Sequence, residues 1–142
     1  MIRTTTGLRV LFSRAQDTWR TPRELYAALE EEFGPFTLDP CPLDTSATAG
    51  ASLWGKDGLQ LDWRGHRLFL NPPYGRGIGQ WLAKAQDAEL AVVLLPARTD
   101  TQWFHVFGPL AAEIRFLRGR LRFGDARSGA PFPSVLLIYR KR

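Results

Sequence analysis

The run Leu68-Phe69-Leu70-Asn71-Pro72-Pro73-Tyr74-Gly75 is the part of the sequence that decides the fold. Its three apolar residues are typical of a short buried strand, and the prolines that follow cannot continue such a strand. A second run, residues 90–95, is apolar throughout, as is typical of a parallel strand covered on both faces. We therefore expect the constrained block 71–75 at the carboxyl end of a strand, where open α/β sheets place their active sites.

A helix is predicted between Thr21 and Gly34. Thr21 is a good N-cap, Pro22 suits the first helical position, and Glu24 completes a capping box with Thr21. Apolar residues then recur at helical spacing as far as Gly34, which ends the helix.

Further elements are predicted on both sides of the central run. Residues 36–38 are expected to form a short strand, and residues 41–67 a long irregular connection of the kind that is usually functional or mobile. Apolar residues at helical spacing predict two more helices, over residues 77–88 and 99–107.

The C-terminal part has a different pattern. Apolar and basic residues alternate over residues 116–123, which is typical of a strand with three arginines on one face. Residues 134–139 form another strand, and the segment 124–133 joins the two as a hairpin. We predict an α/β fold with a mostly parallel sheet and a C-terminal antiparallel hairpin, in which residues 1–18 form an N-terminal arm and residues 19–142 a single domain.

Composition narrows the class of partner. The chain has 142 residues and a formal net charge of +5, which favours a polyanionic partner. Its one cysteine, Cys41, cannot form an internal disulfide, and no cysteine and histidine spacing suggests a metal site. The sequence has no long apolar run and no secretory leader pattern, so we expect a cytoplasmic protein that neither spans a membrane nor binds a metal.

The block from Asn71 to Gly75 suits the transfer of a group to a planar amine such as N6 of adenine. The lone pair of that amine is delocalised into the ring, and two acceptors on its N–H groups favour localisation. The Asn71 side-chain oxygen is one such acceptor, and the Pro72 carbonyl is the other, since proline has a fixed φ and no N–H. Pro73 keeps Pro72 extended, and Tyr74 offers a face on which an extruded base stacks. In a purely structural role the same block is a strand-ending turn.

Several blocks of sequence, taken together, carry a resemblance to a known family. They are Trp19-Arg20-Thr21-Pro22, Phe36-Thr37-Leu38-Asp39-Pro40-Cys41, Asp57-Gly58-Leu59 with Trp63, Asn71-Pro72-Pro73-Tyr74-Gly75, Leu94-Leu95-Pro96-Ala97-Arg98-Thr99-Asp100-Thr101 with Trp103-Phe104-His105, and Gly119-Arg120. The chain resembles, over almost its whole length, the phage and prophage type of DNA N6-adenine methyltransferase. This resemblance implies a truncated Rossmann-like methyltransferase fold, S-adenosylmethionine as the methyl donor, and DNA as the partner.

The resemblance also implies which residues contact the methyl donor. They are Trp19, Thr21, Pro22, Asp39, Pro40, Asp57, Asp62 and Asn71. Asp39 is expected near the amino group of the donor, and Asp62 at the amine of its adenine. The chain departs from common methyltransferases in one respect, because no glycine-rich turn follows Asp39. The close approach of backbone to donor that such a turn allows is therefore not predicted.

Most of these residues also have a structural interpretation. Trp19 could be a hydrophobic staple, and Asp39 could start a turn with Pro40. Asp57 and Asp62 could be ordinary surface charges.

The expected contacts to DNA are aromatic and basic. The residues concerned are Tyr74, Arg98, Arg118, Arg120 and Arg122. Arg98 could instead form an ion pair beside a helix, and the other three arginines could be a charged sheet edge that deters aggregation.

Two other functions stay open at this point. The same block serves planar amines in RNA and the side-chain amide of glutamine in proteins. The chain could also be an inactive DNA-binding module that keeps the scaffold of an enzyme.

Overall fold

The computed structural model describes residues 20–41, 58–123 and 129–141 of the chain. Its centre is a four-stranded sheet with the strand order β1-β2-β4-β3. The strands are β1 (Arg67–Leu70), β2 (Leu90–Pro96), β3 (Glu113–Phe116) and β4 (Ser134–Arg140). The helices are α3 (Arg23–Phe33), α4 (Ile78–Ala85) and α5 (Gln102–Phe107), with short 3-10 turns η1 (Gly58–Gln60) and η2 (Gly108–Leu110).

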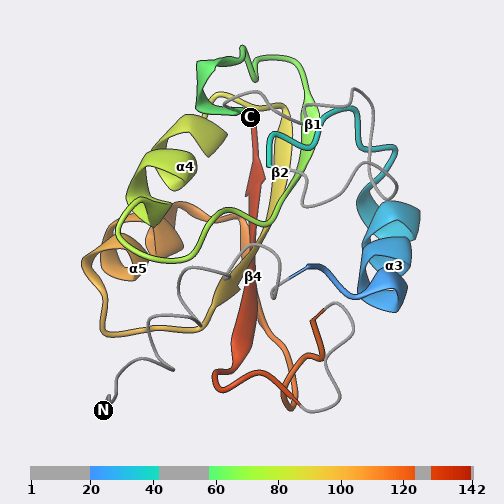
Figure 1. Cartoon of the computed structure of the whole chain (residues 1–142). Helices are drawn as coiled ribbons and strands as arrows, with labels where there is room; N and C mark the ends of the chain where they lie inside the picture. Colours follow the sequence, from blue (N-terminus) through green and yellow to red (C-terminus); the bar gives the residue numbers. More distant parts are fainter. Residues whose placement is uncertain (1–19, 42–57, 124–128, 142) are drawn as a thin grey trace.

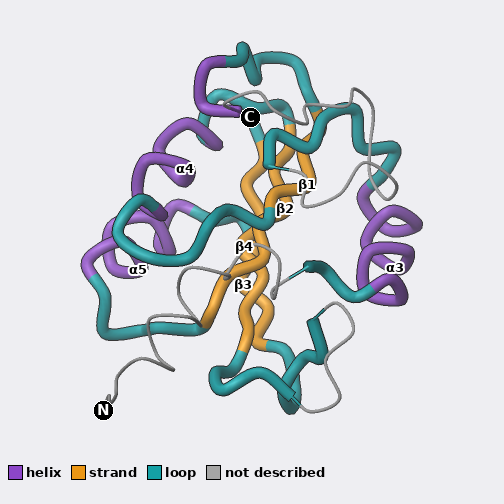
Figure 2. The backbone as a smooth tube through the Cα atoms, viewed as in Figure 1, coloured by secondary structure: helices purple, strands orange, loops and turns teal. Residues whose placement is uncertain are grey.

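The sheet separates two layers of helices. In Figure 1, α4 and α5 lie on one side of the strands and α3 lies on the other, and the tube in Figure 2 shows the same three layers. The two faces of the sheet therefore belong to two different cores. This arrangement confirms the predicted α/β class.

The predicted mostly parallel sheet is wrong. Only β1 and β2 pair in parallel, whereas β2 with β4 and β3 with β4 pair antiparallel. The reason is one reversed strand: β4 runs against its neighbours on both sides, so it turns two of the three pairings antiparallel. An all-apolar strand such as β2 is buried on both faces whichever way its neighbour runs, so its composition could not reveal this direction.

The predicted C-terminal hairpin is antiparallel as expected, but its first strand lies elsewhere. Strand β3 ends at Phe116, where the predicted strand 116–123 begins, and Phe116 lies opposite Val135 of β4. Residues 117–123 are not in a strand, although Arg118 is exposed and Phe123 is buried as the alternation suggested. The alternation of apolar and basic residues thus predicted which side chains are exposed, although the segment does not form a strand.

The predicted strand 36–38 is reduced to a single bridge. Leu38 pairs in parallel with Leu68, and the Thr37 amide donates to the Arg67 carbonyl at 2.8 Å. This segment therefore runs beside β1 in the same direction. It places Asp39 near the carboxyl end of β1, which Asn71 follows.

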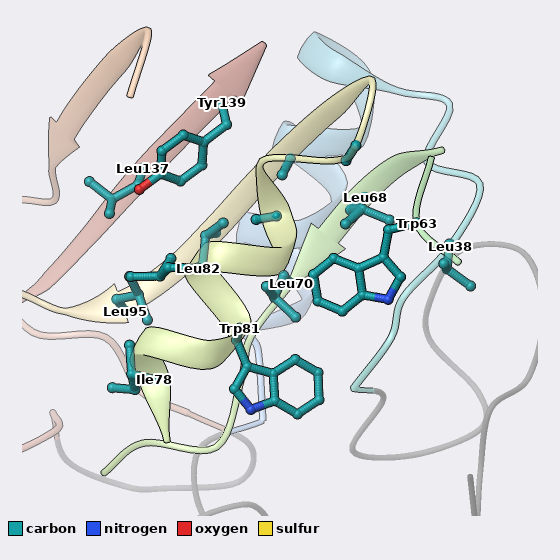
Figure 3. Close-up of a cluster of buried hydrophobic side chains, with 14 of the residues drawn as sticks. Leu38, Trp63, Leu68, Leu70, Ile78, Trp81, Leu82, Leu95, Leu137 and Tyr139 are labelled. Atoms are coloured by element: carbon teal, nitrogen blue, oxygen red, sulfur yellow. The ribbon is translucent and has the colours of Figure 1, made fainter. Parts of the chain in front are cut away.

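Two hydrophobic clusters fill the faces of the sheet. The α4-face cluster, drawn in Figure 3, contains Leu38, Trp63, Leu68, Leu70, Ile78, Trp81, Leu82, Leu95, Leu137 and Tyr139 among its members. The α3-face cluster contains Leu29, Phe33, Phe36, Phe69, Leu90, Val92, Leu94, Phe123, Ala130, Phe132, Leu136 and Ile138. Strand residues alternate between the clusters, because successive side chains point to opposite faces.

Candidate active site

Asn71 follows directly after β1 and is 4% exposed. Its side-chain nitrogen donates a hydrogen bond to Oγ1 of Thr21 at 3.2 Å. An asparagine amide has its nitrogen and oxygen on opposite sides of the side-chain axis. The bond to Thr21 therefore directs the Asn71 oxygen away from Thr21 and fixes the plane of the amide.

Thr21 does not make the predicted capping box. Helix α3 begins at Arg23, its N-cap position is Pro22, and no side chain caps it. The Tyr26 amide donates to the Pro22 carbonyl at 3.0 Å, so Pro22 lies one position earlier than predicted. The Thr21 hydroxyl instead accepts the hydrogen bond from Asn71 at the carboxyl end of β1.

The prolines and the glycine of the block lie in the segment that leads from β1 to α4. Pro72 is buried and Pro73 half-buried beside Asn71. Gly75 has a φ of +133°, a region that other residues rarely adopt. The chain therefore turns away from the sheet at Gly75 and enters α4 at Ile78.

Tyr74 packs against two phenylalanines. Its ring lies edge-on to Phe132, at 5.7 Å between centroids, and to Phe123, at 6.5 Å. The hydroxyl is buried without a hydrogen-bond partner among the described residues. Burial raises the pKa of Tyr74 well above its ordinary value, so this phenol stays protonated at neutral pH.

Asp39 is a buried carboxylate next to the same edge of the sheet. It is 3% exposed, and its Oδ1 accepts a hydrogen bond from the Cys41 amide at 3.0 Å. This turn is the structural role that the sequence left open for Asp39 and Pro40. Since Leu38 pairs with Leu68, Asp39 lies level with Phe69, two residues before Asn71.

Gly58 packs closely against the Pro40 carbonyl of this turn. A Cβ atom on Gly58 would lie 1.8 Å from the Pro40 carbonyl oxygen, so only glycine fits. The Gly58 carbonyl accepts a hydrogen bond from Nε1 of Trp63 at 2.9 Å, and Trp63 stacks on Trp81 of α4. The segment around Gly58 therefore links Pro40 to the α4 side of the sheet.

Asp62 lies in a different environment from Asp39. Its side chain is 60% exposed and forms an ion pair with Arg64 at 2.8 Å. Hydrogen bonds from the Arg64 side chain and amide hold the pKa of Asp62 well below its usual range. Asp62 is therefore an ionised surface carboxylate whose oxygens face Arg64.

The basic residues expected at DNA do not lie on one strand. Arg98 is exposed after β2, with its guanidinium 5.8 Å from the centre of the Phe132 ring. Arg118, Arg120 and Arg122 are exposed, and Nη1 of Arg120 donates to the Ala130 carbonyl at 3.4 Å.

Five described residues were predicted at the donor. Thr21 bonds to Asn71, and Asp39 lies beside β1, level with Phe69. Pro22 and Pro40 follow Thr21 and Asp39 in the chain. Trp19 and Asp57 lie outside the described residues. In the described ranges, no group of three or more His, Cys, Asp or Glu residues could hold a metal ion. Within the same ranges, no helix is long and apolar enough to cross a membrane.

Sequence reasoning missed two features of the site. The hydrogen bond between Thr21 and Asn71 joins residues 50 positions apart and has no local signal. Phe123 and Phe132, which surround Tyr74, belong to a stretch that was interpreted as strand and loop. The position of Phe123 on the apolar face of the alternating segment 116–123 was the one indication of its burial.

The fold and the site define an α/β protein with a candidate site at the carboxyl ends of parallel strands. Residues 10–141 match the family described as DNA N-6-adenine-methyltransferase (Dam), and the chain belongs to this family. A DNA N-6-adenine-methyltransferase of Escherichia phage T1 is 29% identical over 111 residues, which cover 75% of this chain and 47% of the phage protein. The chain thus spans about half the length of that relative. No solved structure matches it.

Proposed function

We propose that this chain transfers the methyl group of S-adenosylmethionine to the N6 amine of an extruded adenine in DNA. Asn71, Pro72, Pro73 and Tyr74 are the catalytic block in this proposal. The observation that carries it is the Asn71 amide, which is buried at the carboxyl end of β1 and oriented by Thr21.

Asn71 and Pro72 act on the amine by accepting its hydrogens. The Asn71 oxygen takes one N–H and the Pro72 carbonyl takes the other, which favours a lone pair localised on nitrogen. A carboxamide does not take up a proton at neutral pH, so Asn71 polarises the amine and the proton is lost to water after transfer. Their contribution is positioning and preorganised electrostatics.

The residues at the sheet edge suit the proposed donor. When bound, S-adenosylmethionine supplies a methyl group on a positively charged sulfonium. Asp39 is a buried acid beside β1 and would hold the donor's amino group, with Pro40 next to it. Thr21 and Pro22 would border the same group from the start of α3, and Trp19 and Asp57 are further candidates.

Asp62 fits the donor under one condition. Its oxygens are bound by Arg64, which would have to release them before they could accept from the amine of the donor's adenine. Because both side chains are exposed, such an ion pair contributes little and its rearrangement costs little.

Tyr74 and the arginines would contact the nucleic acid. Tyr74 offers its ring to the extruded base, which requires the ring or its aromatic neighbours to move apart. Arg98, Arg118, Arg120 and Arg122 would contact phosphates, and the net charge of +5 supports this assignment. The parallel β1–β2 pair, with Asn71 at its carboxyl end, supports a truncated Rossmann-like methyltransferase fold.

The test is transfer of a labelled methyl group from S-adenosylmethionine to DNA, RNA and a glutamine peptide. We expect label on N6 of adenine in DNA alone. Asn71→Ala should abolish transfer while calorimetry still shows donor binding. Gln86→Ala is the matched control, because it removes a carboxamide that bonds to the Leu82 carbonyl in α4, and it should leave transfer unchanged.

Label on RNA or on the peptide would show that the acceptor is not DNA. The absence of saturable donor binding would indicate an inactive module. Full activity in Asn71→Ala would remove Asn71 from the mechanism.

A further inference from the structure

Two buried hydroxyls of this protein have no hydrogen-bond partner among the described residues. Ser134, the first residue of β4, is 1% exposed and its Oγ is unpaired. The Tyr74 hydroxyl is the other. Buried polar groups in folded proteins nearly always have a partner, so an unpaired one at a candidate site points to a ligand.

Ser134 lies on the same face of the sheet as Asn71. Leu136, two residues after Ser134, belongs to the α3-face cluster, whereas the intervening Val135 belongs to the α4-face cluster. Asn71 follows two residues after Phe69, which is also in the α3-face cluster, and it bonds to Thr21 at the start of α3. Strand alternation therefore directs both polar side chains to the α3 face.

The register gives the separation of the two residues. Leu70 lies opposite Val93, and Val93 lies opposite Leu137, so Asn71 is level with Leu136. Ser134 is in β4, the second strand away from β1. It lies two residues beyond the level of Asn71, in the direction in which β1 runs. With strands ~4.8 Å apart and a rise of ~3.3 Å per residue, the two Cα atoms are about 12 Å apart. At this separation both side chains can reach one flat heterocycle from opposite sides.

Aromatic side chains of the α3-face cluster lie near Ser134. Phe132 precedes it by two residues, and the Tyr74 ring lies 5.7 Å from Phe132 and nearly perpendicular to it. Phe123 packs against both rings. Aromatic side chains with a few polar groups among them are typical of residues that contact a flat ligand.

We propose that Ser134 is a specificity-determining contact of the target base. Its hydroxyl donates to a ring nitrogen of the adenine whose N6 amine is held by Asn71. This inference rests on the proposed function. The ring nitrogens of adenine are acceptors and serine can donate, so the contact satisfies a hydroxyl that has no partner among the described residues.

The test compares Ser134→Ala with Tyr139→Phe, which removes a buried hydroxyl from the opposite face of the same strand. The Tyr139 hydroxyl donates to the Phe107 carbonyl at 2.7 Å, so it has a partner within the protein. We expect Ser134→Ala to lower kcat/KM on DNA about tenfold, with an unchanged or higher Tm. Tyr139→Phe should lower the Tm and leave kcat/KM unchanged.

DNA with 1-deaza-, 3-deaza- or 7-deaza-adenine at the target position then identifies the contact. The wild type should lose about tenfold on the analogue that lacks the contacted nitrogen, over and above the loss of Ser134→Ala on that analogue. Equal kcat/KM for Ser134→Ala and wild type on adenine, or equal losses of both proteins on all three analogues, would overturn the proposal. In either case an active wild type leaves the proposed function standing, whereas an inactive wild type removes both.

Discussion

The Asn71 amide and the Thr21 hydroxyl are joined by a hydrogen bond of 3.2 Å, although 50 positions separate them in the chain. This bond connects the segment before α3 to the end of β1. It orients the carboxamide that, in our proposal, accepts a hydrogen from the N6 amine of adenine. In the proposed function, Thr21 is therefore a positioning residue that acts through Asn71, in addition to its proposed place beside the donor.

Thr21→Val should lower kcat about tenfold, because the amide of Asn71 loses the group that orients it. The free energy of unfolding should fall by about 1 kcal/mol, as is usual for one lost hydrogen bond. Thr101→Val is the matched control, since the Thr101 hydroxyl caps α5 by accepting from the Phe104 amide at 3.3 Å. It should lower stability by about 1 kcal/mol with kcat unchanged. Equal kcat in both variants would show that Thr21 does not orient Asn71.

Tyr74→Phe should retain most of the activity, because the ring face is kept, while Tyr74→Ala should lose it. Removal of the unpaired hydroxyl should leave the stability of Tyr74→Phe equal to or above that of the wild type. Burial raises the pKa of Tyr74 in the folded state, so the unfolded state binds fewer protons above pH ~10. Urea unfolding between pH 8 and 11 (a range set by the ordinary tyrosine pKa of about 10) should therefore show a steeper loss of stability with rising pH in the wild type than in Tyr74→Phe. Equal slopes would contradict the burial of this hydroxyl.

Gly58→Ala should destabilise the protein by about 2 kcal/mol, because the new methyl group collides with the Pro40 carbonyl oxygen. Gly77→Ala is the control: nothing lies within 4 Å of its added Cβ, and its φ of −81° is open to alanine. It should be neutral or slightly stabilising. Thermal unfolding measures both, and a stable Gly58→Ala would mean that the turn at Pro40 can move away from Gly58.

The triple replacement of Arg118, Arg120 and Arg122 by alanine should weaken DNA binding and reduce its salt dependence. Each phosphate contact that is lost lowers the slope of log affinity against log salt by about 0.9. Arg64→Ala is the control, because this exposed arginine is already paired with Asp62. Fluorescence anisotropy over a salt series measures the slopes. An unchanged slope in the triple variant would place the DNA on another surface.

Asp62→Asn should weaken binding of S-adenosylmethionine if Asp62 accepts from the donor's adenine. Arg64→Ala should leave the affinity unchanged or raise it, since it removes the partner that competes for the same carboxylate. Calorimetry separates these effects. Unchanged affinity in Asp62→Asn would identify Asp62 as the surface charge that the sequence also allowed.

Local patterns predicted the elements whose cause is local. The helix that ends at Gly34 was confirmed, as was the fully buried strand over residues 90–95, which extends to Pro96. The helices near residues 77–88 and 99–107 were also confirmed, with shorter bounds. Turn residues, helical spacing and an apolar run act over a few neighbours, so they can be read without the fold.

The sequence by itself determined that the block from Asn71 to Gly75 ends a buried strand and that it has the groups to hold a planar amine. Only the tertiary structure decided that β4 runs against both neighbours, that Thr21 bonds to Asn71 rather than capping α3, and that Ser134 faces the same side as Asn71. The physical reason is the distance along the chain over which each feature is determined. Strand direction and side-chain partners depend on contacts between segments far apart in the chain, and no periodicity within either segment contains them.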